Sequence, residues 1–136
     1  MITLAEVRDW LKTFQIAENY YIGKLDNKKD KSIGVYSLNQ KSPPVIAIGG
    51  LDSTTFNRKS VSVLIHWNKN ADETEKAAYS LFERLLEQTH FYIGGTLVFY
   101  LKLNVSEPID AATDEKGVYE RVIEFDLYYK RSEINA

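Results

Sequence analysis

The sequence predicts an α+β fold in which two amphipathic helices pack on one face of a largely antiparallel, mixed sheet of four to six strands. Three observations predict it. Two segments repeat apolar residues at helical spacing, several others alternate apolar and polar residues, and 136 residues with 44% hydrophobic content suit one domain. Helices and strands that each have one apolar face can all bury that face when the helices pack on one side of a sheet. We therefore expect a single domain over residues 1–136.

A helix-start signal opens the chain. Thr3 and Glu6 have the spacing of a capping box, in which each side chain accepts a hydrogen bond from the other residue's backbone N–H. Apolar residues then recur every three or four positions, which predicts an amphipathic helix over residues 4–16. Its apolar stripe consists of Leu4, Val7, Leu11 and Phe14.

Two β-rich runs, Tyr20–Leu25 and Ser32–Leu38, follow this helix. The polar residues 26–30 between them favour a turn, so we expect a β-hairpin with a charged tip. The two prolines at 43–44 cannot donate to a β-ladder. Any strand in the apolar run Val45–Ile48 is therefore expected to be short or at a sheet edge.

The middle of the chain predicts a strand followed by a second helix. Lys59–Asn68 alternates apolar and polar residues, which is typical of a half-buried strand. Asp72 and Glu75 then have the spacing of an N-cap and a third-position carboxylate. The apolar positions of the strand are Val61, Val63, Ile65 and Trp67, and those of the helix are Ala78, Leu81, Phe82, Leu85 and Leu86.

Two further strands are predicted after the glycine pair at 94–95. The first places Leu97, Phe99, Leu101 and Leu103 on one face. Residues 104–117 are rich in acids and turn formers, which predicts an acidic connecting loop. The last strand, Val118–Arg131, has two unlike faces, and we expect the acidic one to be wet or to meet a polar partner. The apolar face carries Tyr119, Ile123, Phe125, Leu127 and Tyr129, and the acidic face carries Glu120, Glu124 and Asp126.

Composition narrows the function classes. A net charge of −2, from 17 basic and 19 acidic residues, disfavours a domain built to neutralise phosphates. The absence of cysteine excludes disulfides, thiolate metal sites and cysteine nucleophiles. The apolar runs are far shorter than a membrane span, and Glu6 interrupts any leader-like start. We expect a soluble protein made in the cytoplasm, with no membrane partner.

The residues that could carry chemistry form no recognised catalytic or metal-binding motif. His66 and His90 lack the spacing of a zinc site, so structural or surface roles are expected for both. The chain has no Gly-x-Ser-x-Gly turn, and its glycine pairs lie outside any phosphate-loop motif. Acids such as Glu120 and Glu124 on a strand face are far more often solvated than catalytic. We expect no enzyme activity and no cofactor.

Two other readings stay open. The end of the last strand combines aromatic and basic residues, namely Tyr128, Tyr129, Lys130 and Arg131, as RNA-recognising sheets do. This favours a nucleic-acid-binding accessory domain, although the neighbouring acids oppose it. The other reading is a small ligand-binding or enzymatic α+β domain, which would need a concave polar pocket.

Three segments carry a family resemblance, in this order: ITLAEVRDWLKTF, SVSVLIHWNKNADETEKAAYSLFERLL and DEKGVYERVIEFDLYYKR. The chain resembles the small tail terminator proteins of long-tailed bacteriophages and prophages, also called minor capsid proteins. The resemblance implies a structural protein of the virion tail, at its neck. It implies a ring, expected to be a hexamer, that docks on the last ring of the tail tube protein. The ring would stop tube polymerisation and present a surface to the head completion or connector protein.

The resemblance brings no residue motif, so site residues are inferred from charge and loop context. Acids lining a lumen would keep DNA from adhering, because like charges repel, and genomic DNA would pass without specific binding. We expect the acidic residues of 104–117 to face this lumen or a ring neighbour, and the tip of the hairpin to contact the tube or an adjacent subunit. The residues are Glu107, Asp110, Asp114 and Glu115 in the first group, and Asp26, Lys28, Lys29 and Lys31 in the second.

Overall fold

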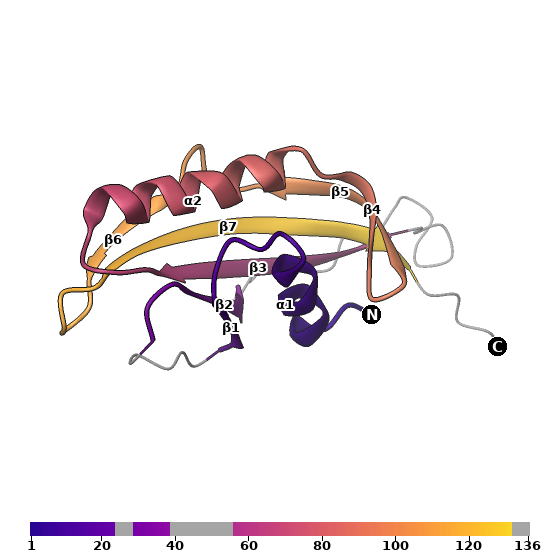
Figure 1. Ribbon diagram of the computed structural model, residues 1–136. Helices are drawn as coiled ribbons and strands as arrows, with labels where there is room; N and C mark the ends of the chain where they lie inside the picture. Colours follow the sequence, from indigo (N-terminus) through magenta and orange to yellow (C-terminus); the bar gives the residue numbers. More distant parts are fainter. Residues whose placement is uncertain (24–28, 39–55, 132–136) are drawn as a thin grey trace.

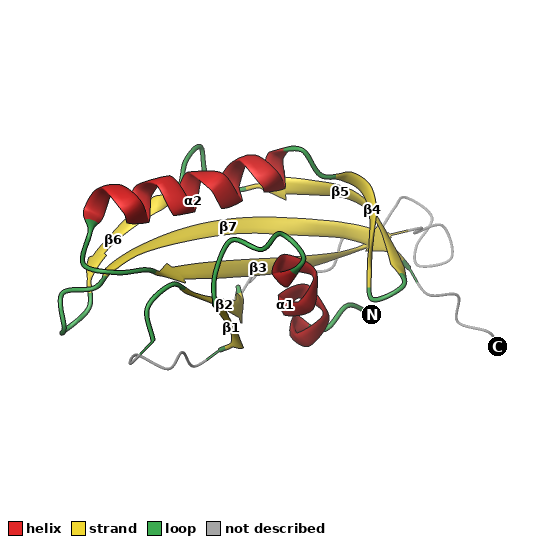
Figure 2. Cartoon of the chain, in the orientation of Figure 1, coloured by secondary structure: helices red, strands yellow, loops and turns green. Residues whose placement is uncertain are grey.

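The computed structural model describes residues 1–23, 29–38 and 56–131, which form two helices and one curled, mixed sheet (Figures 1 and 2). The predicted α+β class and mixed sheet are confirmed. The sheet has seven strands, more than the predicted four to six, in the order β1-β2-β3-β7-β5-β4, with β6 pairing β7. The elements are α1 (Leu4–Lys12), β1 (Asn19–Ile22), β2 (Ser32–Ser37), β3 (Phe56–His66), α2 (Ala71–Leu86), β4 (Thr89–Ile93), β5 (Thr96–Leu103), β6 (Ile109–Thr113) and β7 (Tyr119–Lys130).

The capping box predicted for the first helix is present. Thr3 Oγ1 accepts a hydrogen bond from the Glu6 N–H at 3.2 Å, and Glu6 Oε1 accepts one from the Thr3 N–H at 3.0 Å. The helix ends at Lys12, earlier than predicted, because Gln15 has a φ of 56° that cannot continue it. Phe14 is still buried, so the apolar stripe outlasts the helix.

The prediction that Tyr20–Leu25 and Ser32–Leu38 form a β-hairpin is wrong. β1 and β2 are neighbours but run parallel, with Asn19 opposite Ser32 and Ile22 opposite Val35. The start of β1 is held beside the start of β2, because the Lys31 carbonyl accepts hydrogen bonds from the N–H groups of residues 18 and 19. The predicted Val45–Ile48 run lies outside the described residues.

The centre of the sheet is the antiparallel pair β3 and β7, in register from Phe56 opposite Lys130 to His66 opposite Glu120. The alternation predicted for both strands is confirmed, because every apolar position assigned to the core faces except Tyr119 is buried. The other face of β7 differs from the prediction. Glu120 and Glu124 are half-buried and Asp126 is only 4% exposed, so this face is not uniformly wet.

Three corrections concern the second half of the chain. A register shift between Val98 and Tyr100 reverses the alternation of β5, so Val98 and Leu101 are buried and Leu97 and Phe99 are only half-buried. β4 was not predicted. The predicted acidic loop contains β6, whose five residues are all exposed and therefore show no alternation of burial.

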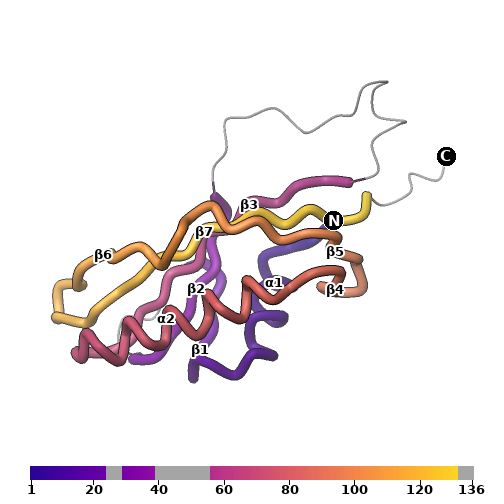
Figure 3. Tube along the Cα trace, turned by 90° about the horizontal axis from the view of Figure 1, so that it is seen from above, coloured from indigo at the N-terminus to yellow at the C-terminus, as the bar shows by residue number. Residues whose placement is uncertain are grey.

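The second helix begins at Ala71, and its N-cap is Asn70 rather than the predicted Asp72. The Asn70 side chain accepts a hydrogen bond from the Glu73 N–H at 3.0 Å. Asp72 and Glu73 lie in the first turn, where their negative charges suit the helix dipole. The buried residues of both helices belong to the same hydrophobic cluster as the apolar face of β2, β3 and β7. Figure 3 shows the curl of the sheet and places β6 and β1 at opposite margins of it.

Gly94, in the β4–β5 turn, supports a stability prediction. It has a φ of 55°, and a Cβ at this position would overlap the carboxylate of Glu6, the capping-box residue. Gly94→Ala should lower the free energy of unfolding by about 1.5–4 kcal/mol, because left-handed strain of about 1–2 kcal/mol adds to about 0.5–2 kcal/mol for moving Glu6 out of the capping box. Gly95→Ala is the matched control, because its φ is 82° but a Cβ would meet nothing within 4 Å. In urea unfolding, Gly95→Ala should lose only the free energy that corresponds to the left-handed strain. Equal losses of unfolding free energy for both variants would contradict this account.

Candidate functional site

Parts of the two segments singled out by charge lie at one end of the sheet, on either side of the end of β3. The Lys31 N–H donates to the Trp67 carbonyl at 2.7 Å, and the Trp67 N–H donates to the Tyr119 carbonyl at 3.1 Å. The start of β2, the end of β3 and the start of β7 therefore lie side by side. We call this the His66 end of the sheet, defined by the row Ser32, His66 and Glu120.

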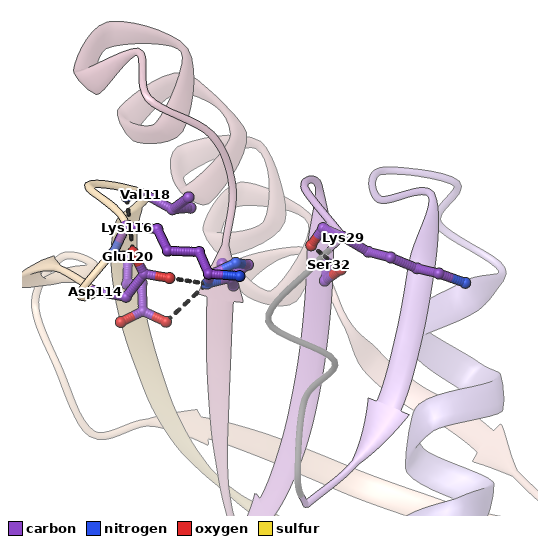
Figure 4. Close-up of polar contacts among 7 residues, drawn as sticks. Lys29, Ser32, Asp114, Lys116, Val118 and Glu120 are labelled. Atoms are coloured by element: carbon purple, nitrogen blue, oxygen red, sulfur yellow. Dashed lines mark hydrogen bonds and ion pairs between the residues drawn. The ribbon is translucent and has the colours of Figure 1, made fainter.

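On the lysine side of this end, Lys29 is exposed and Lys31 is half-buried. The Lys29 carbonyl accepts a hydrogen bond from Ser32 Oγ at 2.9 Å, which fixes the chain where β2 begins (Figure 4). Asp26 and Lys28, the other predicted tip residues, lie outside the described residues.

On the acidic side, Asp114 builds the turn between β6 and β7. Its Oδ1 accepts hydrogen bonds from the N–H groups of Lys116 and Val118, both at 2.9 Å. The Val118 N–H is the main cause that lowers the pKa of Asp114, with help from the Lys116 N–H and from the charge of Lys116. The carboxylate is therefore occupied by its own chain. Its neighbour Glu115 is exposed.

His66 is fully buried although it lies on the face of β3 opposite the apolar residues. Its Nδ1 lies 3.0 Å from Glu120 Oε2 and 3.8 Å from Asp114 Oδ2, so two acids reach toward one imidazole (Figure 4). An ionised carboxylate only accepts, so Nδ1 donates to Glu120. The expected structural role of His66 fits this arrangement, but the partners do not show in the sequence, since Glu120 is 54 residues away.

Glu107 and Asp110 lie further along the β6 side, and both are exposed. Glu107 Oε2 accepts a hydrogen bond from the Tyr79 hydroxyl at 3.1 Å, which raises the pKa of Tyr79 and links α2 to the chain before β6. Asp110 Oδ1 accepts the Ala112 N–H at 2.8 Å. Of the four predicted acids, only Asp114 is thus turned into the His66 end.

A cleft of about 510 Å³ lies beside these acids, lined by residues 104–110 and Arg121. It is one of the concavities that the ligand-binding reading could use. Its charged groups are partly engaged, because Arg121 Nη2 lies 3.3 Å from Glu75 Oε2 and Glu107 binds Tyr79. A ligand would have to compete with these contacts. Among residues 1–23, 29–38 and 56–131, no group of three or more His, Asp or Glu side chains is placed to hold a metal ion.

The aromatic and basic end of β7 does not present all its residues on one face. Tyr129 is buried in the core, whereas Tyr128 points to the other face and packs near Phe56 and Tyr100, with ring centroids 5.8 Å and 6.1 Å away. Lys130 is exposed. The surface that could stack on bases therefore consists of Tyr100, Tyr128 and Phe56, and Tyr100 is 55% exposed.

No helix in the described part of the chain is long and apolar enough to cross a membrane.

Asp114 gives a pH-dependent prediction. Its folded pKa lies below the unfolded value of about 3.9, so its stabilisation is present above that value and is lost as the pH falls through the folded pKa. Asp114→Asn keeps an acceptor oxygen but removes the charge, and should cost about 1 kcal/mol at pH 7. The free energies of unfolding of the wild type and of Asp114→Asn, measured in urea, should converge at acidic pH. Glu115→Gln, an exposed neighbour, is the control and should match the wild type at every pH; a constant deficit for Asp114→Asn would contradict this account.

The comparisons with known proteins give one family. The family model described as "Bacteriophage tail terminator protein" matches residues 2–131. Curated protein sequences give no match. Among solved structures, one described as "Structure of bacteriophage SPP1 gp17 protein" is similar with a TM-score of 0.47 and 10% identity, over 97% of this chain and 87% of that chain. The family assignment rests on the sequence match alone. Because that match spans nearly the whole sequence, the chain belongs to the bacteriophage tail terminator protein family.

Proposed function

We propose that copies of this chain form a ring, expected to be a hexamer, that caps the tail tube, ends its polymerisation and provides the surface to which the head is joined. The observation that supports this proposal is the family match over residues 2–131. Membership of the family supports a structural role in the phage tail, and the function follows from shape and contacts rather than from a reaction.

Capping requires two unlike faces. One face of the ring must resemble the end of a tube ring closely enough to bind the last one, and the other must not offer a surface for the next. A head-to-tail contact that recurs without closing makes a filament, so growth stops when the added copy lacks the recurring surface. The ring then offers its outer face to the head completion or connector protein.

We place the acidic residues of the β6 side in the ring, facing the lumen or a neighbouring copy. Glu107, Asp110 and Glu115 are exposed, whereas the Asp114 carboxylate is held by its own turn. In the lumen, acids would repel the phosphates of passing DNA and keep the duplex from adhering. Between copies, they would meet basic groups. Lys29 and Lys31 supply such groups, and we propose that they contact the tube or an adjacent subunit.

Deletion of the gene tests the capping role. Without a cap, tubes should continue to grow and should not join heads, because nothing blocks the growing end. Electron microscopy of lysates should show tails with a broad distribution of lengths, and infectious titre should fall by several orders of magnitude. A plasmid copy of the gene is the control and should restore both. Infectious particles with tails of normal length after deletion would contradict the proposal.

A charge reversal tests the lysine side of the His66 end. Lys29→Glu should reduce the yield of infectious particles about tenfold, the loss that corresponds to about 1.4 kcal/mol of contact energy. Lys130→Glu is the matched control, since Lys130 is also exposed but lies at the opposite end of the sheet, beside Phe56. Plaque titres of both variants, with unfolding curves to show that each folds, make the measurement. Equal titres would remove Lys29 from the proposed contact.

A further inference from the structure

The sheet has two unpaired margins at the same level. β1 is the last strand on one side and pairs only with β2, and β6 pairs only with β7 on the other side, among the described strands. The registers connect them. Tyr21 lies opposite Gly34, Gly34 opposite Leu64, Leu64 opposite Val122, and Val122 opposite Ile109. One row therefore runs from β1 to β6 across five strands, and Figure 3 shows these two strands at opposite margins.

The directions of these strands suit a side-by-side contact between copies. β1 is parallel to β2, and each of the next three pairings, to β3, to β7 and to β6, is antiparallel. β6 therefore runs opposite to β1. A second copy placed beside the first in the same orientation would bring its β6 antiparallel to β1, which is the more stable of the two ladder types.

Each margin also exposes an apolar side chain. Ile22 on β1 is 40% exposed and Ile109 on β6 is 43% exposed, although they lie on opposite faces of the sheet because Ile109 is level with Tyr21. An unpaired strand edge carries free backbone N–H and C=O groups, and proteins commonly protect such an edge with charges or cover it. The regular part of β6, at Ile109 and Asp110, is level with Tyr21 and Tyr20 of β1. The two edges therefore match in level as well as in direction.

Charge distinguishes the two margins. Lys29 and Lys31 precede β2, next to the start of β1, and the Lys31 carbonyl accepts the Asn19 N–H. The β6 margin carries the exposed acids Glu107 and Asp110. The β1 margin is mixed in charge, because exposed Glu18 and Asp30 lie beside these lysines. It therefore repels the acids of the β6 margin less than a second β6 margin would.

We propose that neighbouring copies in the ring join edge to edge, with β6 of one copy pairing antiparallel with β1 of the next. The partner is a second copy of this chain, and the inference rests on the proposed ring, whose contact surfaces it names. Each copy uses two different edges, so the contact is heterologous and repeats from copy to copy until the twist and curl of the sheets close the ring. In this arrangement the acids of the β6 side face a neighbouring copy rather than the lumen.

Cysteine cross-linking tests the pairing cleanly, because the chain has no cysteine of its own. A double variant, Tyr21→Cys with Ile109→Cys, places two thiols on the same face of the shared row, where opposed Cβ atoms in an antiparallel pair come within about 5.5 Å. Oxidation of the concentrated full-length protein should give a ladder of linked species on a non-reducing gel. Each single variant should stay monomeric, because its only cysteine would meet no partner.

The control double variant is Tyr21→Cys with Tyr100→Cys. Tyr100 is 55% exposed but lies on β5, inside the margin formed by β4, so it should not cross-link. Linked dimers from a single variant would mean that like edges meet, and would overturn the proposal. Linkage in the control at the same rate as in the Tyr21 and Ile109 pair would overturn it too, as would a double variant that stays monomeric.

Negative-stain microscopy of the same samples separates this inference from the proposed ring. Annuli formed without a disulfide between positions 21 and 109 would keep the ring and overturn the edge pairing. A ladder of linked species without annuli would support the edge pairing and contradict a closed ring.

Discussion

The antiparallel pairing of β3 with β7 is the constraint on which the rest of the fold depends. The two strands stay in register over the whole of β3, and their apolar residues fall on one face, where the buried residues of both helices join them. A slip of one residue would turn Val63 and Ile123 to the other face and expose the core, so the register is fixed by burial. Every other strand is attached directly or indirectly to this pair.

The neighbours of the central pair change along its length. At the His66 end, β2 and β1 extend the sheet on one side and β6 on the other, whereas at the opposite end β5 and β4 follow β7. The chain thereby makes two ends of unlike composition from one ladder. The proposed capping role would need such unlike surfaces, and in this fold they follow from where strands begin and stop.

Local signals predicted the central elements, and non-local pairings decided the others. The alternation in β3 and β7 and the capping box at Thr3 depend on neighbouring residues, and the structure contains all three. The direction of β1 depends on Lys31 binding residues 18 and 19, which no local pattern encodes. β6 escaped prediction because all its residues are exposed, so alternation is absent.

The same distinction applies to the candidate site. Charge and loop context selected eight residues, and the structure places Lys29, Lys31 and Asp114 at the His66 end, with the lysines on the β2 side of β3 and Asp114 on the β7 side. Sequence context could not separate an acid that shapes its own turn, Asp114, from an exposed one, Glu115, because the difference lies in the hydrogen bonds of Asp114 with Lys116 and Val118. The sequence likewise could not predict the burial of His66 beside Glu120 and Asp114, because that arrangement depends on the pairing of β3 with β7 and on the turn before β7.

Edge pairing between copies would make the width of the sheet set the size of the ring. Five strands cross the row from β1 to β6, and at about 4.8 Å between strands each copy contributes roughly 24 Å of circumference. Adding or removing one copy then changes the diameter by roughly 8 Å, by division by π. A step of that size is too large for side chains to absorb at a contact with a tube of fixed width. The number of copies would therefore be set by the fit to the tube. The hydrogen-bonded row through Ser32, His66 and Glu120 would fix the width that each copy adds to the ring.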